Sequence, residues 1–316
     1  MRGKSWNEKG RIPNTTLKTN LEMGMCMKNP KHNKIPFIIL LVIHVCLLGY
    51  SFYKTKNKKQ LFILLMSNVA LAYLLEFFVL NLYKAYKYKP RVLKKKYFDN
   101  TLGAILSQTI FVPFTAVFLT SRKIGWIGKI LGGVYFSLVE IVFLRLKVYK
   151  HHWWKTVYTL VLIPFYFKIS DWWNCLLTKQ ISLIRFISLF FMIMVTEANL
   201  IFVFATLRKI RFGVGRVHSL NEHFIVVPLY AILYSLFSSL SFLKENNWIS
   251  KRRLLIFSVI FEHFFNKVKL VKEKFYFVDY LTVRVLTTLL YGLYRDWVYG
   301  KNNEVKGTDS EEYGVK

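Results

Sequence analysis

The sequence consists largely of about nine apolar segments separated by short basic loops, with glutamates near the middle of two segments and again about 120 residues later. A helix needs about 20 apolar residues to cross a bilayer. The segments that clearly meet this length are 35–53, 61–83, 101–120, 124–144, 153–173, 181–207 and 223–243. The chain is therefore predicted to be an all-α, polytopic integral membrane protein that has the lipid bilayer as its main partner.

The last two segments are less regular than the first seven. Residues 254–265 are strongly apolar but short, and they reach spanning length only if the basic stretch 248–253 is drawn in by snorkelling, so this segment either crosses or is re-entrant. Residues 275–299 are long enough but contain Asp279 and Arg284, which favours a helix that faces other helices rather than lipid. We expect about nine transmembrane helices, or eight if 254–265 does not cross.

Composition and charge argue against a soluble or nucleic-acid-binding protein. At 54% hydrophobic and 17% aromatic residues, the chain exceeds what a soluble domain usually carries. The formal charge of +29 is spread over the loops between apolar segments, so nucleic acid is not an expected partner. Loops on the amino-terminal side hold 27 Lys and Arg against 15 on the other side, which predicts a cytoplasmic amino terminus by the positive-inside rule.

Several residues recur at nearly one spacing, which indicates an internal duplication. Glu76 and Glu197 are 121 residues apart, and Glu140 and Glu262 are 122 apart. An even number of helices per unit makes the two copies parallel, related by an axis along the membrane normal. The predicted organisation is a basic leader at 1–34, a leading helix at 35–53, four-helix repeats at 61–173 and 181–299, and an acidic disordered tail at 300–316. Met23, Met25 and Met27 crowd the end of the leader, and the true start could lie among them.

Glu76, Glu140, Glu197 and Glu262 all fall within apolar segments, where an ionised carboxylate costs free energy unless it is paired or faces a wet cavity. One hypothesis is that the four line a site or path for protons, cations or small polar solutes, with Arg284 as countercharge. The other is that protonated glutamates hydrogen-bond between helices and fix their packing. A path requires the glutamates of both units to share a cavity, whereas a packing role allows each to be sealed in its own bundle.

His151, His152, Trp153, Trp154 and Lys155 form a polar aromatic motif between two apolar segments. Histidine, tryptophan and lysine together are typical of the headgroup level of a membrane, so we expect an interfacial position. Adjacent histidines diverge by about 100 degrees on a helix, which disfavours a metal pair.

No enzymatic motif is recognisable in the sequence. It lacks a phosphate-binding glycine loop, a nucleophile elbow, and a histidine and carboxylate at catalytic spacing. Cys26, Cys46 and Cys175 lie far apart with no Cys-x-x-Cys pair. We therefore expect neither enzymatic activity nor a cofactor nor a metal site.

The run from Glu140 through the motif His151–Lys155 to Asp171-Trp172-Trp173 resembles a family of small, uncharacterised multispanning proteins from spore-forming Gram-positive bacteria. The resemblance covers roughly 61–173, and a degraded second copy carries Lys274-Phe275-Tyr276 in place of the His-Trp turn. It implies a multi-helix membrane fold in a bacterial plasma membrane, and it brings no known activity.

Two functions are compatible with these patterns. The first is binding or passage of a proton, cation or small polar solute between the two units, carried by the glutamates. The second is a structural or partner-binding role in the cell or spore envelope, without transport. The amides Asn68, Gln108 and Asn199, which lie within apolar segments, fit either function.

Overall fold

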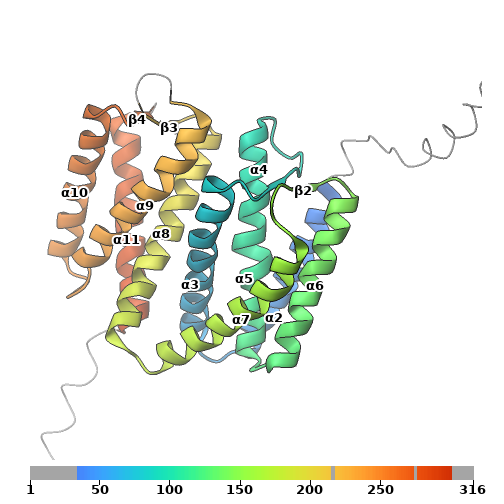
Figure 1. The fold of residues 1–316 in the computed structure, drawn as a ribbon. Coiled ribbons are helices and arrows are strands. Elements are labelled where there is room, and N and C mark those ends of the chain that lie inside the picture. The colour runs from blue at the N-terminus through green and yellow to red at the C-terminus, as the bar shows by residue number, and fades with distance from the viewer. Residues whose placement is uncertain (1–33, 215–217, 274–275, 301–316) are drawn as a thin grey trace, which may run out of the picture.

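The structure, a computed structural model, describes residues 34–214, 218–273 and 276–300. Long helices make up almost all of it, and they lie side by side with alternating directions (Figure 1). The predicted all-α class is confirmed. Most of the predicted leader and tail, together with Lys274 and Phe275, lie outside the described residues.

The long helices are joined by short loops, and two three-residue strand pairs are the only sheet in the described part of the chain. After α2 (Ile35–Lys54) come α3 (Lys58–Glu76), η3 (Phe77–Leu82), β1 (Tyr86–Tyr88), α4 (Lys96–Ile105), η4 (Leu106–Phe111), α5 (Val112–Ser121), α6 (Trp126–Arg145), β2 (Tyr149–His151) and α7 (Thr156–Thr178). Then follow α8 (Ser182–Thr206), β3 (Ile210–Phe212), α9 (Leu220–Ser241), α10 (Trp248–Lys267), β4 (Val271–Glu273) and α11 (Phe277–Tyr299). The π-helices η3 and η4 continue α3 and α4, so α3–η3 and α4–η4–α5 each form one rod.

The order helix, strand, helix, helix, strand, helix occurs twice, and we call α3 to α7 the first half and α8 to α11 the second half. Within each half the two strands pair antiparallel: Tyr86 faces His151 across β1 and β2, and Ile210 faces Glu273 across β3 and β4. Both strand pairs lie at the same end of the molecule (Figure 1). Each strand pair therefore ties the loop after the first helix of a half to the loop before its last helix.

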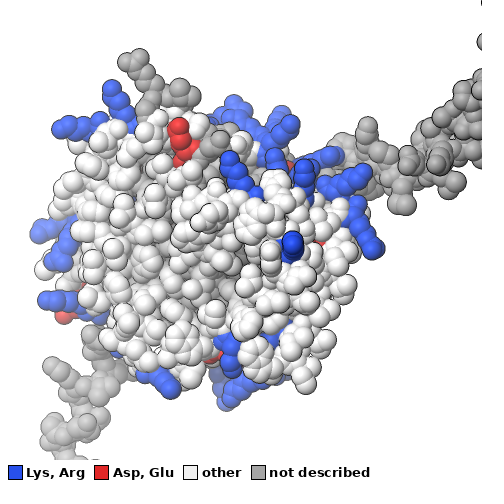
Figure 2. Space-filling view, viewed as in Figure 1, with Lys and Arg blue, Asp and Glu red and all other residues white. Residues whose placement is uncertain are grey.

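Six helical rods are long and apolar enough to cross a membrane: α2, α3–η3, α4–η4–α5, α6, α8 and α9. The remaining long helices, α7, α10 and α11, contain 23, 20 and 23 residues. The segment expected to be short or re-entrant thus extends into one continuous helix, α10. Large apolar side chains are exposed along several helices, and most of the face in Figure 2 is uncharged, with Lys and Arg mainly at its margins. An apolar outer surface of this kind is compatible with a membrane protein.

The largest hydrophobic cluster lies where α3 of the first half meets α8 of the second. Leu64 and Met192 are fully buried in it, and Ser67 and Ser188 approach each other with their hydroxyl oxygens 3.5 Å apart. A second cluster fills the space among α2, α5, α6 and α7. The two halves are therefore joined by direct helix packing rather than by a linker alone.

Basic residues in the left-handed region follow five of the helical rods: Lys84, Lys123, Lys147, Arg208 and Lys269 have φ between 49° and 62°. After α6, the Lys147 N–H donates to the Leu144 carbonyl at 3.0 Å, and the Val148 N–H donates to the Phe143 carbonyl at 3.1 Å. This is the Schellman pattern, which satisfies the last carbonyls of a helix. A cation at this position also interacts favourably with the negative end of the helix dipole.

Candidate functional site

Glu76 lies at the junction of α3 and η3 and lines a cavity of about 130 Å³ between the two halves. The first half contributes α3, η3, α4 and η4 to its wall, and the second half contributes α8 and α9. The polar groups of the lining are Tyr73, Glu76, Asn81, Thr101, Gln108, Asn199 and His223. A cavity of this size and polarity can hold several water molecules or a small ligand.

The Glu76 carboxylate is only half satisfied by protein groups. The Tyr86 hydroxyl donates to its Oε2 at 2.5 Å, and Gln108 Nε2 donates to the same oxygen at 3.0 Å. Its Oε1 is buried and has no hydrogen-bond partner among the described residues. Because leaving a buried polar atom unpaired costs about 1–3 kcal/mol, this oxygen is suited to take a proton, a cation or a bound solute.

Both π-helices adjoin this cavity. Glu76 immediately precedes η3, and Gln108 lies within η4. A π-helical turn is rare and occurs mostly as a local insertion, frequently at a functional site. Neither insertion is visible in the sequence pattern, because one extra residue in a turn hardly changes the hydrophobic periodicity of an apolar helix.

Glu140 occupies a different place, within the first half, and is fully hydrogen-bonded. His151 Nε2 lies 2.7 Å from its Oε1, the Thr156 hydroxyl donates to the same oxygen at 2.8 Å, and the Thr159 hydroxyl donates to Oε2. The carboxylate therefore connects α6 to β2 and to the start of α7. Its contacts are those of a packing residue.

The predicted interfacial motif folds over the end of η3. The Trp153 indole N–H donates to the Tyr83 carbonyl at 2.7 Å, and the backbone N–H of His152 donates to the Ala85 carbonyl at 2.8 Å. Trp154 Nε1 donates to Thr159 at 3.0 Å. Because Lys155 directly precedes α7, the motif holds the segment that follows η3 against the start of α7.

A second cavity, of about 120 Å³, lies inside the first half. Glu140 lines it together with aromatic residues of the strand pair, Tyr86 and Tyr149 among them. Tyr86 and Tyr149 have ring centroids 5.3 Å apart. Gln108 lines this cavity as well as the Glu76 cavity, so only a thin partition separates the two.

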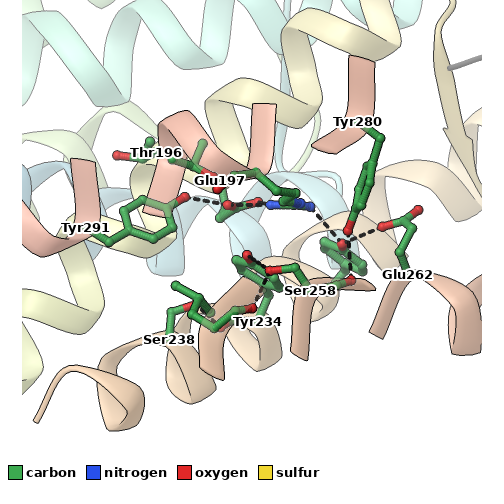
Figure 3. A network of polar contacts seen from close by, with 12 residues as sticks. Thr196, Glu197, Tyr234, Ser238, Ser258, Glu262, Tyr280 and Tyr291 are labelled. Carbon is green, nitrogen blue, oxygen red and sulfur yellow. Dashed lines mark hydrogen bonds and ion pairs between the residues drawn. The ribbon is translucent and has the colours of Figure 1, made fainter. Parts of the chain in front are cut away.

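In the second half, Glu197, Glu262 and Arg284 belong to one buried network (Figure 3). Arg284 Nη1 donates to both oxygens of Glu197, at 2.8 and 3.0 Å, and Tyr291 donates to the same carboxylate. Arg284 Nη2 donates to the Tyr230 hydroxyl at 3.1 Å, and that hydroxyl donates to Glu262 at 3.0 Å. The cavity left beside this network measures only about 30 Å³.

The candidate residues are thus divided among three cavities. Glu76 lines the cavity between the halves, Glu140 the one inside the first half, and Glu197 and Glu262 the small one with Arg284. The structure brings Arg284 to Glu197 as the expected countercharge. A single cavity shared by all four glutamates is not found in the described part of the chain.

The sequence pattern did not indicate the tyrosines that contact the carboxylates, nor the ion pairs Lys129–Asp171, His151–Glu140 and Arg295–Asp296. Tyr86 and Tyr291 lie 10 and 94 residues from the glutamates they contact. Lys129 Nζ lies 2.7 Å from Asp171 Oδ2, with the lysine side chain 3% exposed. The only usable signal was the placement of tyrosine, lysine and aspartate inside apolar segments, and it carries no information on which residues meet.

Comparison with known proteins assigns no family to the chain. Neither a family model, nor a curated protein, nor a solved structure matches the chain. Within the described residues, no group of three or more His, Cys, Asp or Glu could hold a metal ion.

Proposed function

We propose that this chain is a multi-pass integral membrane protein of nine helices, built from two parallel copies of a four-helix unit after the leading helix α2. The repeated order of helices and strands and the six apolar rods support this arrangement. The strand-bearing end holds most of the basic loops, so the positive-inside rule puts that end and the amino terminus in the cytoplasm. The family resemblance of the first half favours a bacterial plasma membrane.

The function that the geometry supports best is binding, and passage, of a proton, a cation or a small polar solute at the Glu76 cavity. This proposal is narrower than a path lined by all four glutamates, because Glu140, Glu197 and Glu262 line other cavities. One observation carries the proposal: Glu76, a buried glutamate with one carboxylate oxygen that has no hydrogen-bond partner among the described residues, lines a cavity of about 130 Å³ between the two halves. Ionisable residues at membrane depth that face a cavity mark ion or proton pathways in membrane proteins. Sites between internal repeats are the usual substrate positions in transporters.

The proposal is tested by reconstituting the full chain in lipid vesicles and following internal pH and the movement of Na⁺, K⁺ and small polar solutes. Glu76→Gln keeps the size of the side chain and one acceptor oxygen, replaces the other oxygen with an NH2 donor and removes the charge. We expect the flux to fall about tenfold or more. Glu245→Gln makes the same chemical change at an exposed loop position and should leave the flux unchanged. Absence of any flux in the wild-type protein would contradict transport.

The structural alternative is favoured by the second half. Hydrogen bonds through Tyr230 connect Glu262 to the Glu197–Arg284 pair, and the network leaves little free space. A network of this kind fixes helices relative to one another and needs no ligand. Under this alternative the protein is a non-catalytic structural or partner-binding component of the cell or spore envelope. The protein then moves no solute, and Glu76→Gln changes only its stability.

A further inference from the structure

The cavity inside the first half and the small cavity of the second half lie at matching places in the two halves. Ile163 lies seven residues after the start of α7 and lines the first, and Arg284 lies seven residues after the start of α11 and lines the second. Glu140 and Glu262 likewise both lie fourteen residues into α6 and α10. The first residues of the strands, Tyr86 and Ile210, also line the two cavities.

The first helix of each half completes the match. Ala72 lies fourteen residues before Tyr86, and Glu197 lies thirteen before Ile210. The difference of one residue is what a single π-helical insertion in η3 adds. By this register the position of Glu197 corresponds to Ala72, and Glu76 lies about one helical turn further along α3.

The two cavities differ in what fills them. In the second half, the guanidinium of Arg284 pairs with Glu197, and its carbon atom lies 4.4 Å from the ring centroid of Tyr234. In the first half, Ile163 and Ala72 replace both members of this pair. The open volume rises from about 30 Å³ to about 120 Å³.

The first-half cavity nevertheless keeps the groups that favour a cation. Glu140, which already accepts from Thr156 and Thr159 and lies 2.7 Å from His151 Nε2, lines it with its side chain 9% exposed. Tyr86, Tyr149 and Trp154 present aromatic rings, and no Lys or Arg is among the described residues of its lining. Aromatic faces and a carboxylate in a desolvated site attract guanidinium and ammonium groups. Burial raises the pKa of Tyr88, which also lines the cavity, and the negative charges of Glu76 and Glu140 add to the rise.

We propose that the first-half cavity binds a small organic cation, an alkylguanidinium or a primary alkylammonium, at the place where the second half carries its own Arg284. The alkyl part lies among the apolar lining, and the cationic head lies against the aromatic rings beside Glu140. This site is separate from the Glu76 cavity and does not depend on transport.

The test is calorimetric titration of the purified full chain in detergent with n-propylguanidinium, which reproduces the end of an arginine side chain. N-propylurea has nearly the same shape but no charge, and it serves as the matched control ligand. We expect saturable binding of the cation and at least about tenfold weaker binding of the urea. Equal binding of the two ligands, or no binding up to about 10 mM, overturns the proposal.

Two variants make the test specific to this cavity. Ile163→Arg fills it with a guanidinium and should weaken n-propylguanidinium binding about tenfold or more, whereas Ile163→Leu should not. Arg284→Ala empties the second-half site, so the same cation should raise the melting temperature of that variant more than that of the wild-type protein, and N-propylurea should not. Retained affinity in a folded Ile163→Arg protein contradicts the site. Ile163 lines this cavity and not the Glu76 cavity, so loss of cation binding without loss of flux in Ile163→Arg separates this proposal from the transport function.

Discussion

At the scale of single residues, two glutamates in corresponding helices differ in how fully their carboxylates are hydrogen-bonded. Glu197 accepts from Arg284 and Tyr291 and is fully buried, whereas Glu76 has one oxygen without a partner among the described residues. A fully paired buried carboxylate is held in place by its neighbours, while a half-paired one can exchange a proton or a ligand at small structural cost. The same amino acid therefore serves packing in one half and a candidate site in the other.

Removing one partner of the buried pair is expected to destabilise the protein strongly. Arg284→Met leaves the Glu197 charge buried without its cation, which typically costs about 3–5 kcal/mol. The double variant Glu197→Leu/Arg284→Met removes both charges and should recover most of that loss. Thermal unfolding of the purified variants in detergent measures both effects. A double variant as unstable as Arg284→Met would show that the pair itself, rather than an orphaned charge, is what stabilises the second half.

At the scale of the element, helix ends depend on a backbone conformation that few residues adopt easily. Lys147 follows α6 with φ 57°, where an L-residue costs about 1–2 kcal/mol and a β-branched one costs more. We expect Lys147→Gly to keep or slightly raise the free energy of unfolding, and Lys147→Val to lower it by about 1–2 kcal/mol or more. Arg145→Val removes the same charge inside the last turn, where φ is helical, and is the control in the same melting experiment. Equal losses for the two valine variants would contradict the backbone argument.

Element prediction from the sequence succeeded where long hydrophobic runs decide the structure and failed where a few residues do. The apolar run of α8 predicts its own helix, because 25 residues with little charge have no other way to satisfy their backbone in lipid. The three-residue strands carry too little alternation to be recognised, and their pairing joins positions far apart in sequence. His151, one of the three partners of Glu140, belongs to the motif that was expected at the membrane surface. Its contact with Glu140 was not predicted, because spacing along the chain does not show that β2 folds back onto α6.

At the scale of the whole molecule, the helices alternate in direction, so assigning one end of the molecule to one side of the membrane fixes the direction of every helix. The strand pairs and their basic loops lie at one end, and the loops after α5, α7 and α9 lie at the other (Figure 1). Glu140 and Glu262 lie at equivalent positions of the two halves, because each follows the start of its helix by the same number of residues. Glu76 and Glu197 do not lie at equivalent positions when they are counted back from Tyr86 and Ile210, so spacing in sequence alone overstated their equivalence.

The topology can be checked with single cysteines in a chain whose own three cysteines are replaced by serine, using a maleimide that does not cross membranes. Lys123, Lys179 and Lys244 are exposed in loops at the end without strands, and Lys150 and Lys272 are exposed on the strands. We expect cysteines at the first three positions to react in right-side-out vesicles, and cysteines at the last two to react only in inverted vesicles. Lys244 and Lys272 flank α10, so opposite labelling of this pair requires α10 to cross the membrane. If both react from the same side, α10 does not cross, and the second half cannot be a parallel copy of the first.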